Sequence, residues 1–280
     1  DDIEDDDPFR YGDATLHRRF GIPTAINIGD YLIGMGYRLI SRDAGQIGPE
    51  AASEILDRLA DAHLKLSEGQ GAELLWRDSR QKRLTPLDAL KIYALKTAPA
   101  FEAALFSGLR LAGPSENAAW VSQFARHLGV AFQILNDLGD WRGDDHNKLR
   151  AAGDVLGGRP TVLWALALEG LDERAREELE SLVVSPPLDE TTLRRVRQLY
   201  SLAGVFDKAE RLVDKYQERA EAVADEIANE DLRRLLYYLV DTVLERPLAA
   251  EPAIVLPTLP IEGSGSYTQR VPGVQGSGSG

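Results

Sequence analysis

Apolar residues recur at α-helical spacing along most of this chain. The segment from Ala25 to Ile40 is small and apolar, with Leu32, Met35, Leu39 and Ile40 at helical intervals. Two further stripes are Val121, Phe124, Ala125, Leu128, Ala131, Phe132 and Leu135, and then Val205, Ala209, Leu212, Val213, Tyr216, Ala220, Val223 and Ile227. We find no convincing strand alternation and no hairpin turn of the Asn-Gly type. The sequence therefore predicts an all-α, single-domain helical bundle.

The boundaries of two helices can also be predicted. Thr85-Pro86-Leu87-Asp88 has the residues typical of a helix start, with Thr85 as the N-cap and Pro86 at the first helical position. We expect this helix to continue through Leu95 to Leu111. The segment from Leu232 to Leu244 is predicted to be the last helix.

Proline, glycine and serine become frequent after Arg246, which disfavours regular helix. We predict a helical domain over residues 1–247 and a flexible tail over residues 248–280. The alternative is a docking peptide, because the segment from Tyr267 to Pro272 lies between two Gly/Ser spacers. Such a peptide could bind a partner or a shell protein.

Charge and composition exclude several classes of protein. The 280 residues carry a net charge of −13, which disfavours nucleic acid as a partner. Cysteine is absent, so disulfides, thiol nucleophiles and zinc–thiolate sites are excluded. No apolar stretch reaches the ~18 residues of a membrane span, and the acidic start is unlike a signal peptide. We expect a cytoplasmic protein whose native chain begins upstream of Asp1.

Two acidic clusters stand far apart in the sequence. The first acidic cluster is residues 1–7 (DDIEDDD), and the second is residues 136–140 (NDLGD). Each places oxygen ligands at i and i+4, namely Asp1 with Asp5 and Asn136 with Asp140, which share a face if the segment is helical. Mg²⁺ binds such oxygens together with substrate phosphates. We predict that the two clusters face one cavity and hold Mg²⁺ ions around a diphosphate, although an acidic chain end by itself is more often a solvated tail.

Several motifs, in order, resemble those of the trans-isoprenyl diphosphate synthases, also called the polyprenyl synthetase family. The resemblance runs from Asp1 to about Arg246. The motifs are Asp1 to Asp5, Arg10-Tyr11-Gly12, Thr15-Leu16-His17, Ala25 to Asp30 (AINIGD), Gly69 to Glu73 (GQGAE), Lys96-Thr97-Ala98, and Phe132 to Asp140 (FQILNDLGD).

The resemblance implies an isoprenoid-synthase fold and a reaction that joins an allylic diphosphate to isopentenyl diphosphate. It implies three Mg²⁺ ions per site with substrate bound, and a homodimer built through packed helices. The implied metal site has Asp1 and Asp5 as direct ligands, Asp2 behind them, Asn136 and Asp154 on a further ion, and Asp137 and Asp140 in support. The implied diphosphate contacts are Arg10, Gln70, Lys96, Lys148 and Arg159, and the implied catalytic residues are Lys96, Thr97 and Gln133.

Departures from the family pattern keep other functions open. The helices that precede the first acidic cluster in the family, and carry part of its isopentenyl diphosphate site, do not precede Asp1 here. Tyr11 replaces a second arginine of the family pattern, and Asn136 replaces an aspartate. Glu73 replaces an aspartate and Arg159 replaces a lysine, which keeps the charge but changes the length of the side chain. We predict a synthase of short- or medium-chain prenyl diphosphates. The alternatives are a class I terpene cyclase or a prenyltransferase with another acceptor, and a non-catalytic subunit that modulates an active partner.

Overall fold

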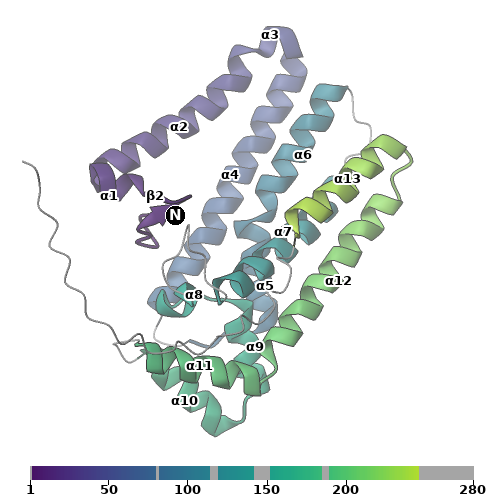
Figure 1. The fold of residues 1–280 in the computed structure, drawn as a ribbon. Helices are drawn as coiled ribbons and strands as arrows, with labels where there is room; N and C mark the ends of the chain where they lie inside the picture. The colour runs from purple at the N-terminus through teal and green to yellow at the C-terminus, as the bar shows by residue number, and fades with distance from the viewer. Residues whose placement is uncertain (1, 80–81, 114–118, 142–151, 185–188, 246–280) are drawn as a thin grey trace, which may run out of the picture. The chain divides into compact units, whose positions relative to one another are not determined.

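The computed structural model of the chain describes residues 2–79, 82–113, 119–141, 152–184 and 189–245. Residues 1–246 form one compact unit, and its fold is all-α, as predicted (Figure 1). The predicted flexible tail and docking peptide lie outside the described residues, and both stay predictions. Among the described helices, none is long and apolar enough to cross a membrane.

The elements follow one another as β1 (Phe9–Arg10), β2 (Asp13–Ala14), α1 (Leu16–Phe20), α2 (Ile22–Arg42), α3 (Ala44–Ile47), α4 (Pro49–Asp78), α5 (Pro86–Lys96), α6 (Ala98–Ala112), α7 (Ala119–Asp140), α8 (Gly153–Leu156), α9 (Val162–Gly170), α10 (Glu173–Val184), α11 (Glu190–Leu202), α12 (Val205–Asp225) and α13 (Glu230–Val243).

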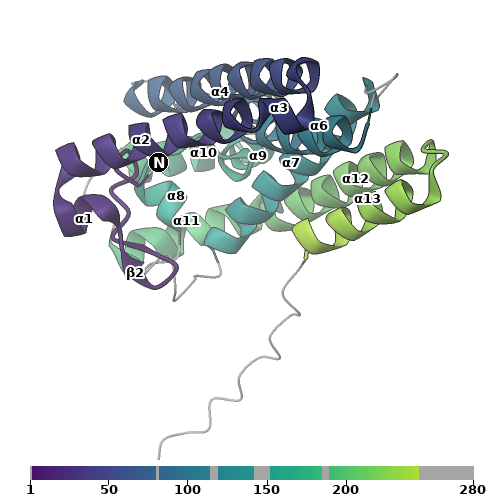
Figure 2. The ribbon, with the colours of Figure 1, turned by 90° about the horizontal axis from the view of Figure 1, so that it is seen from above.

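The predicted apolar stripes lie on α2, α7 and α12. Helix α7 is the centre of the bundle, because it packs against α6 on one side and α12 on the other. Helix α4 packs against α5 and α6, α2 against α4, and α13 against α12 (Figures 1 and 2). The α7 stripe is buried at Val121, Phe124 and Leu128, so apolar burial along one helical face positions the second acidic cluster at the end of α7.

Helix α5 begins as predicted but ends earlier. The Thr85 hydroxyl accepts a hydrogen bond from the Asp88 backbone N–H at 3.2 Å, which satisfies one free donor of the first turn. The expected continuation to Leu111 is wrong, since the helix ends at Lys96 and Thr97 is non-helical at φ −126° and ψ −47°. Pro99 lies in the first turn of α6, where its missing N–H costs nothing, whereas it would break a continuous helix. Lys96 and Thr97 therefore lie at a break between two helices.

Two glycines allow neighbouring helices to approach this break closely. A Cβ atom at Gly69 of α4 would lie 2.5 Å from the backbone N of Lys96, and one at Gly129 of α7 would lie 2.8 Å from the Cα of Ala98. No side chain fits at such distances. The break is therefore enclosed between the backbones of α4 and α7.

The first acidic cluster differs from the prediction. Residues 2–6 form turns rather than a helix, so the helical face predicted for Asp1 and Asp5 is wrong, and Asp1 itself lies outside the described residues. Asp6 adopts a positive φ of 53°, which a right-handed helix does not allow. The cluster leads into a small hairpin in which Phe9 pairs with Ala14 and Arg10 with Asp13. Tyr11 and Gly12 both have positive φ, as in a type I′ turn, so this pair of short strands escaped the search for longer alternating patterns.

We predict that Gly69→Ala loses about 1–3 kcal/mol of unfolding free energy, because the methyl group would push the backbones apart. Gly71→Ala on the same helix is the matched control, since among the described residues nothing beyond its own stretch of helix lies within 4 Å of its Cβ position. Alanine there should be neutral or stabilising by about 0.5–1 kcal/mol. Urea unfolding of the two variants measures the difference, and equal midpoints would show that the close contact does not constrain the fold.

Candidate active site

The Arg159 guanidinium connects the N-terminal turn to the segment after the second acidic cluster. Its Nη2 lies 3.0 Å from Asp5 Oδ2, and its Nη1 donates to Asp154 Oδ1 at 2.8 Å. Burial by itself would lower the pKa of Arg159, but the charges of Asp154, Asp5 and Glu73 outweigh it and raise the pKa. Arg159 therefore stays charged and holds together two predicted metal ligands that are distant in sequence.

One carboxylate oxygen of Asp5 is buried without a hydrogen bond from the described residues. Its side chain is only 8% exposed, yet Oδ1 has no hydrogen-bond partner among the described residues. Arg77 Nη1 lies 3.8 Å from that oxygen, and the same nitrogen donates to the Glu4 carbonyl at 2.9 Å. A buried carboxylate oxygen without a donor is a suitable ligand for a hard cation.

Other predicted substrate contacts bind the same N-terminal turn. Arg10 Nε donates to Asp2 Oδ1 at 2.7 Å, and this hydrogen bond raises the pKa of Arg10. Gln70 Nε2 donates to Glu4 Oε2 at 2.6 Å. Arg10 and Gln70 therefore approach the first acidic cluster from the hairpin and from α4. The predicted diphosphate contact Lys148 lies outside the described residues.

Lys96 lies at the break between α5 and α6, and its ammonium group pairs with the buried carboxylate of Glu73. Its Nζ donates to Glu73 Oε2 at 2.8 Å, and Glu73 is only 5% exposed. The ion pair explains why a lysine is stable at this inward position, since an unpaired charge would be costly. Glu73 Oε1 has no hydrogen-bond partner in the described part of the chain.

The second acidic cluster presents its side chains in two directions. Asn136 is exposed, whereas Asp137 and Asp140 are buried. Asp140 Oδ2 accepts from the Asp154 backbone N–H at 2.9 Å, which fixes the start of α8. Asp140 thus supports the backbone that carries Asp154, and the predicted roles of Asn136 and Asp140 at a metal ion stay predictions.

Asp137 belongs to a buried hydrogen-bond chain. Its Oδ2 accepts from the Tyr93 hydroxyl, and its Oδ1 accepts from Gln133 Nε2 at 3.3 Å. Gln133 Oε1 in turn accepts from the Thr97 hydroxyl at 3.1 Å. Burial and the charge of Asp154 raise the pKa of Asp137, although the bonds from Tyr93 and Gln133 oppose this shift. The predicted catalytic residues Thr97 and Gln133 thus contact each other.

The predicted metal-ligand atoms at the Arg159 bridge are carboxylate oxygens of Asp5 and Asp154, which are the type of ligand that Mg²⁺ prefers. Within the described ranges, no three His, Asp or Glu side chains lie close enough together to hold a metal ion by themselves. Among these ligand atoms, Asp5 Oδ1 is buried and accepts no hydrogen bond from the described residues, so it is free to bind a cation. The residues therefore fit a cation that takes its remaining ligands from substrate.

Two residues of this region escaped the sequence analysis. Tyr93 lies at apolar spacing in α5, so in a single sequence it looks like an ordinary core residue. Arg77 lies near the end of α4, where a basic residue is common because it stabilises the helix dipole. Only the folded structure brings Arg77 to the first acidic cluster and Tyr93 to Asp137.

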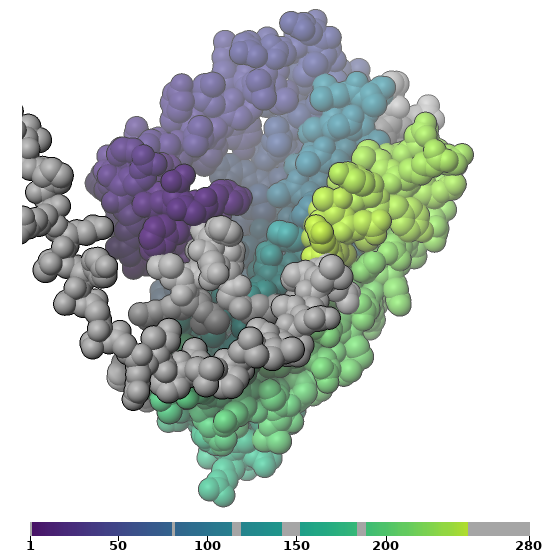
Figure 3. Space-filling view, in the orientation of Figure 1, coloured from purple at the N-terminus to yellow at the C-terminus, as the bar shows by residue number. Residues whose placement is uncertain are grey.

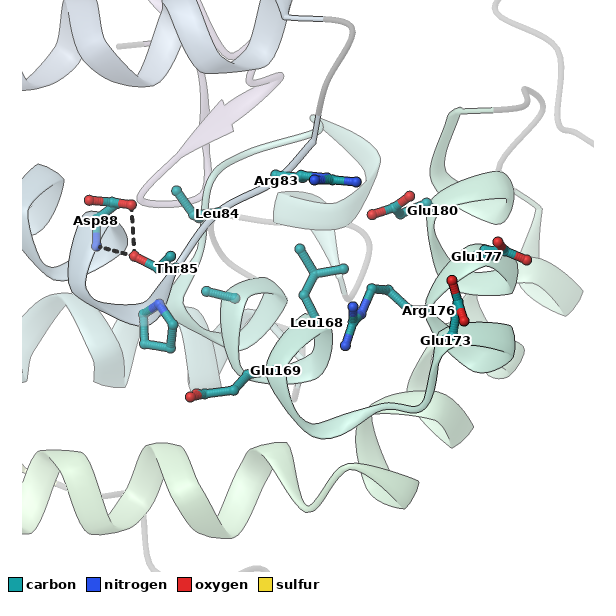
Figure 4. A pocket seen from close by; sticks show the side chains of 12 residues that line it. Arg83, Leu84, Thr85, Asp88, Leu168, Glu169, Glu173, Arg176, Glu177 and Glu180 are labelled. Carbon is teal, nitrogen blue, oxygen red and sulfur yellow. Dashed lines mark hydrogen bonds between the residues drawn. The ribbon is translucent and has the colours of Figure 1, made fainter.

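A separate cavity of about 660 Å³ lies between the start of α5, α9 and α10. Figure 4 shows Glu173, Glu177 and Glu180 projecting from α10 at this cavity. None of the residues predicted for catalysis, substrate or metal lines it. Of the predicted site residues, Asp5, Asp154 and Arg159 are instead brought together at the Arg159 bridge. Figure 3 shows a recessed surface between the N-terminal residues, in purple, and α13, in yellow-green.

The sequence profile of the family described as Polyprenyl synthetase matches residues 1–201. The chain is 29% identical over 249 residues to the short chain isoprenyl diphosphate synthase of Methanothermobacter thermautotrophicus, covering 88% of this chain and 74% of the relative. It is 30% identical over 252 residues to the geranylfarnesyl diphosphate synthase of Aeropyrum pernix, covering 88% of this chain and 77% of the relative.

Solved structures agree with the sequence relatives. The fold resembles polyprenyl synthase from Caulobacter crescentus, complexed with calcium and isoprenyl diphosphate, with a TM-score of 0.75 and 26% identity over 88% of this chain and 73% of that one. Geranylgeranyl pyrophosphate synthetase from Pyrococcus horikoshii has the same fold, with a TM-score of 0.75 and 24% identity over 88% and 74% of the two chains. The chain therefore belongs to the polyprenyl synthetase family and is a prenyltransferase of the isoprenyl diphosphate synthase type.

Proposed function

We propose that the enzyme condenses an allylic diphosphate with isopentenyl diphosphate in a Mg²⁺-dependent reaction, and releases a short- or medium-chain prenyl diphosphate. The observation that carries this proposal is the Arg159 bridge between Asp5 and Asp154. Relatives are named as short chain, geranylfarnesyl and geranylgeranyl diphosphate synthases, which supports a product in this range.

In the proposed reaction the allylic carbon–oxygen bond breaks, and both electrons leave with the pyrophosphate. The double bond of isopentenyl diphosphate then attacks the allylic cation, and a proton passes from the resulting cation to the released pyrophosphate, which restores a double bond. Arg159 and Lys96 would contact the diphosphate, Arg159 through a planar fork and Lys96 as a point charge. Arg10, Gln70 and Lys148 are proposed as further contacts.

Thr97 and Gln133 are proposed to stabilise the cation. Oxygen atoms of a hydroxyl and an amide carry partial negative charge, and they face each other at 3.1 Å beside Lys96. Dipoles held in place before the reaction stabilise a developing charge without reorganising. The hydrogen bond from Gln133 Nε2 to Asp137 supports this arrangement, because it fixes which end of the amide points toward Thr97.

The metal site is proposed on the described residues Asp2, Asp5, Asn136 and Asp154, together with Asp1. When bound, Mg²⁺ would neutralise the charge that develops on the leaving pyrophosphate. A relative from Corynebacterium glutamicum is described as complexed with isoprenyl diphosphate and magnesium, which supports this choice of ion. Three ions remain the proposed number.

A homodimer is proposed through α2. Of its residues only Ala25 is buried, whereas Leu32 and Leu39 are 59% and 56% exposed and Ile26 is 51% exposed. An apolar helix face of this kind is typical of an interface, and a two-fold dimer covers it with its own copy.

The first test of the proposed function is a product assay. The full-length protein with Mg²⁺ should convert dimethylallyl, geranyl or farnesyl diphosphate to longer prenyl diphosphates only when isopentenyl diphosphate is present. Mass spectrometry of the products reports the chain length. Hydrocarbons or alcohols formed without isopentenyl diphosphate would instead favour a terpene cyclase, and no turnover with any primer would favour a non-catalytic subunit.

A charge-removing variant tests the metal assignment. Asp5→Asn should lower turnover by about 100-fold or more, since a lost ligand weakens transition-state stabilisation by several kcal/mol. Asp6→Asn is the matched control, because Asp6 is in the same cluster but its side chain is 77% exposed. Steady-state assays across a Mg²⁺ titration compare the two. Equal activities would remove Asp5 from the metal site.

The dimer predicts a change of mass in solution. Leu32→Asp with Leu39→Asp should convert a dimer into a monomer of 30.8 kDa, because two charges would have to be desolvated at the interface. Leu202→Asp is the control, since Leu202 is 74% exposed on α11. Sedimentation velocity measures the masses. A monomeric wild type would show that α2 does not form a dimer interface.

A further inference from the structure

The Tyr93 hydroxyl joins three helices inside the bundle. Tyr93 lies on α5, is 3% exposed and precedes Lys96 by about one helical turn. Its hydroxyl donates to Asp137 Oδ2 on α7 and accepts from the backbone N–H of Val162 at 2.6 Å. Val162 is the first residue of α9. One oxygen atom therefore fixes α5, α7 and the start of α9 relative to one another.

On the α7 side, this hydroxyl binds the same carboxylate that orients Gln133. Asp137 receives Tyr93 at Oδ2 and Gln133 at Oδ1, so both carboxylate oxygens have donors. Because a carboxylate accepts only, Gln133 must direct its NH₂ toward Asp137 and its carbonyl toward the Thr97 hydroxyl. The orientation of the two proposed cation-stabilising groups thus depends on a carboxylate that Tyr93 holds in place.

On the α9 side, the same hydroxyl fixes the segment that carries Arg159. Thr161 begins α9 as its N-cap, and its backbone N–H donates to the Arg159 carbonyl at 3.0 Å. Val162 follows directly and is bound to Tyr93. If this contact were lost, the start of α9 and the Arg159 guanidinium two residues upstream of its cap could shift relative to Asp5 and Asp154.

We propose that Tyr93 is a positioning residue for the diphosphate and cation-stabilising groups of this enzyme. The inference rests on the proposed function, and it assigns to Tyr93 a part in turnover beyond packing. Phenylalanine would fill the same space but would leave Asp137 Oδ2 and the Val162 N–H without their partner in a buried region. Supporting groups of this kind typically change activity or metal affinity by about 10- to 100-fold when removed.

The experiment compares Tyr93→Phe with Tyr200→Phe. Tyr200 is also fully buried, but its hydroxyl has no hydrogen-bond partner among the described residues, so its removal controls for the loss of a buried oxygen. Calorimetry measures the binding of inorganic pyrophosphate in Mg²⁺, and kinetics measure kcat and KM with geranyl and isopentenyl diphosphates. Tyr93→Phe should lower kcat and pyrophosphate affinity by about 10- to 100-fold, with the KM for isopentenyl diphosphate unchanged. Tyr200→Phe should stay close to the wild type.

A second variant keeps the test decisive if Tyr93→Phe does not fold. Asp137→Asn keeps an oxygen acceptor for Tyr93 but presents an amide NH₂ to Gln133, which would then have to reverse. It should fold and lose kcat by about the same 10- to 100-fold. Where Tyr93→Phe folds, the loss in the double variant should be smaller than the product of the two single losses, because both changes disturb the orientation of Gln133.

The outcomes separate this inference from the proposed function. Equal effects of Tyr93→Phe and Tyr200→Phe, or an unchanged Asp137→Asn variant, would overturn the positioning role while leaving wild-type prenyl transfer intact. A wild type that makes no prenyl diphosphate but binds pyrophosphate in Mg²⁺ would overturn the proposed function alone. The positioning role then stands only if Tyr93→Phe weakens that binding and Tyr200→Phe does not.

Discussion

Arg159 lies between the carboxylates of Asp5 and Asp154, and the arrangement of the site depends on this contact. Removing charged groups from water is costly unless each charge is paired and hydrogen-bonded. Here the one positive charge of Arg159 faces the two negative charges of Asp5 and Asp154. These three side chains therefore keep a net negative charge although they are largely buried. Such a cluster attracts cations, and a diphosphate could then be bound by a chain whose net charge of −13 would otherwise repel it.

The rest of the bundle holds the partners of this cluster in place. Asp140 binds the backbone of Asp154, and Glu73 pairs with Lys96 at the helix break. Most of these groups lie at the ends of helices or at breaks between them, where the backbone can turn a side chain toward the site. The apolar stripes of α7 and α12 supply the packing, and the polar groups are carried by α4, α5, α8 and the end of α7.

Much of the helical framework could be predicted from the sequence, because burial of one helical face requires apolar residues at helical spacing along the chain. The N-cap at Thr85 was also readable, since it depends on residues close to one another in the chain. The break at Thr97 was missed although Pro99 signals it locally, because the apolar pattern continues across it. The turn in the first acidic cluster could not be foreseen, since it depends on contacts with Arg77 and Arg159. The same holds for the burial of Asp137, which is satisfied only by residues distant in sequence.

The close contact at Gly69 has a consequence for sequence variation in this enzyme. Gly69 meets the backbone of Lys96 rather than a side chain, so the position of the ammonium group is set by main-chain atoms that every residue type shares. Substitutions elsewhere in the core can change side-chain volumes without moving this reference point. A bundle built in this way can change many of its core side chains while its main chain keeps the lysine in place.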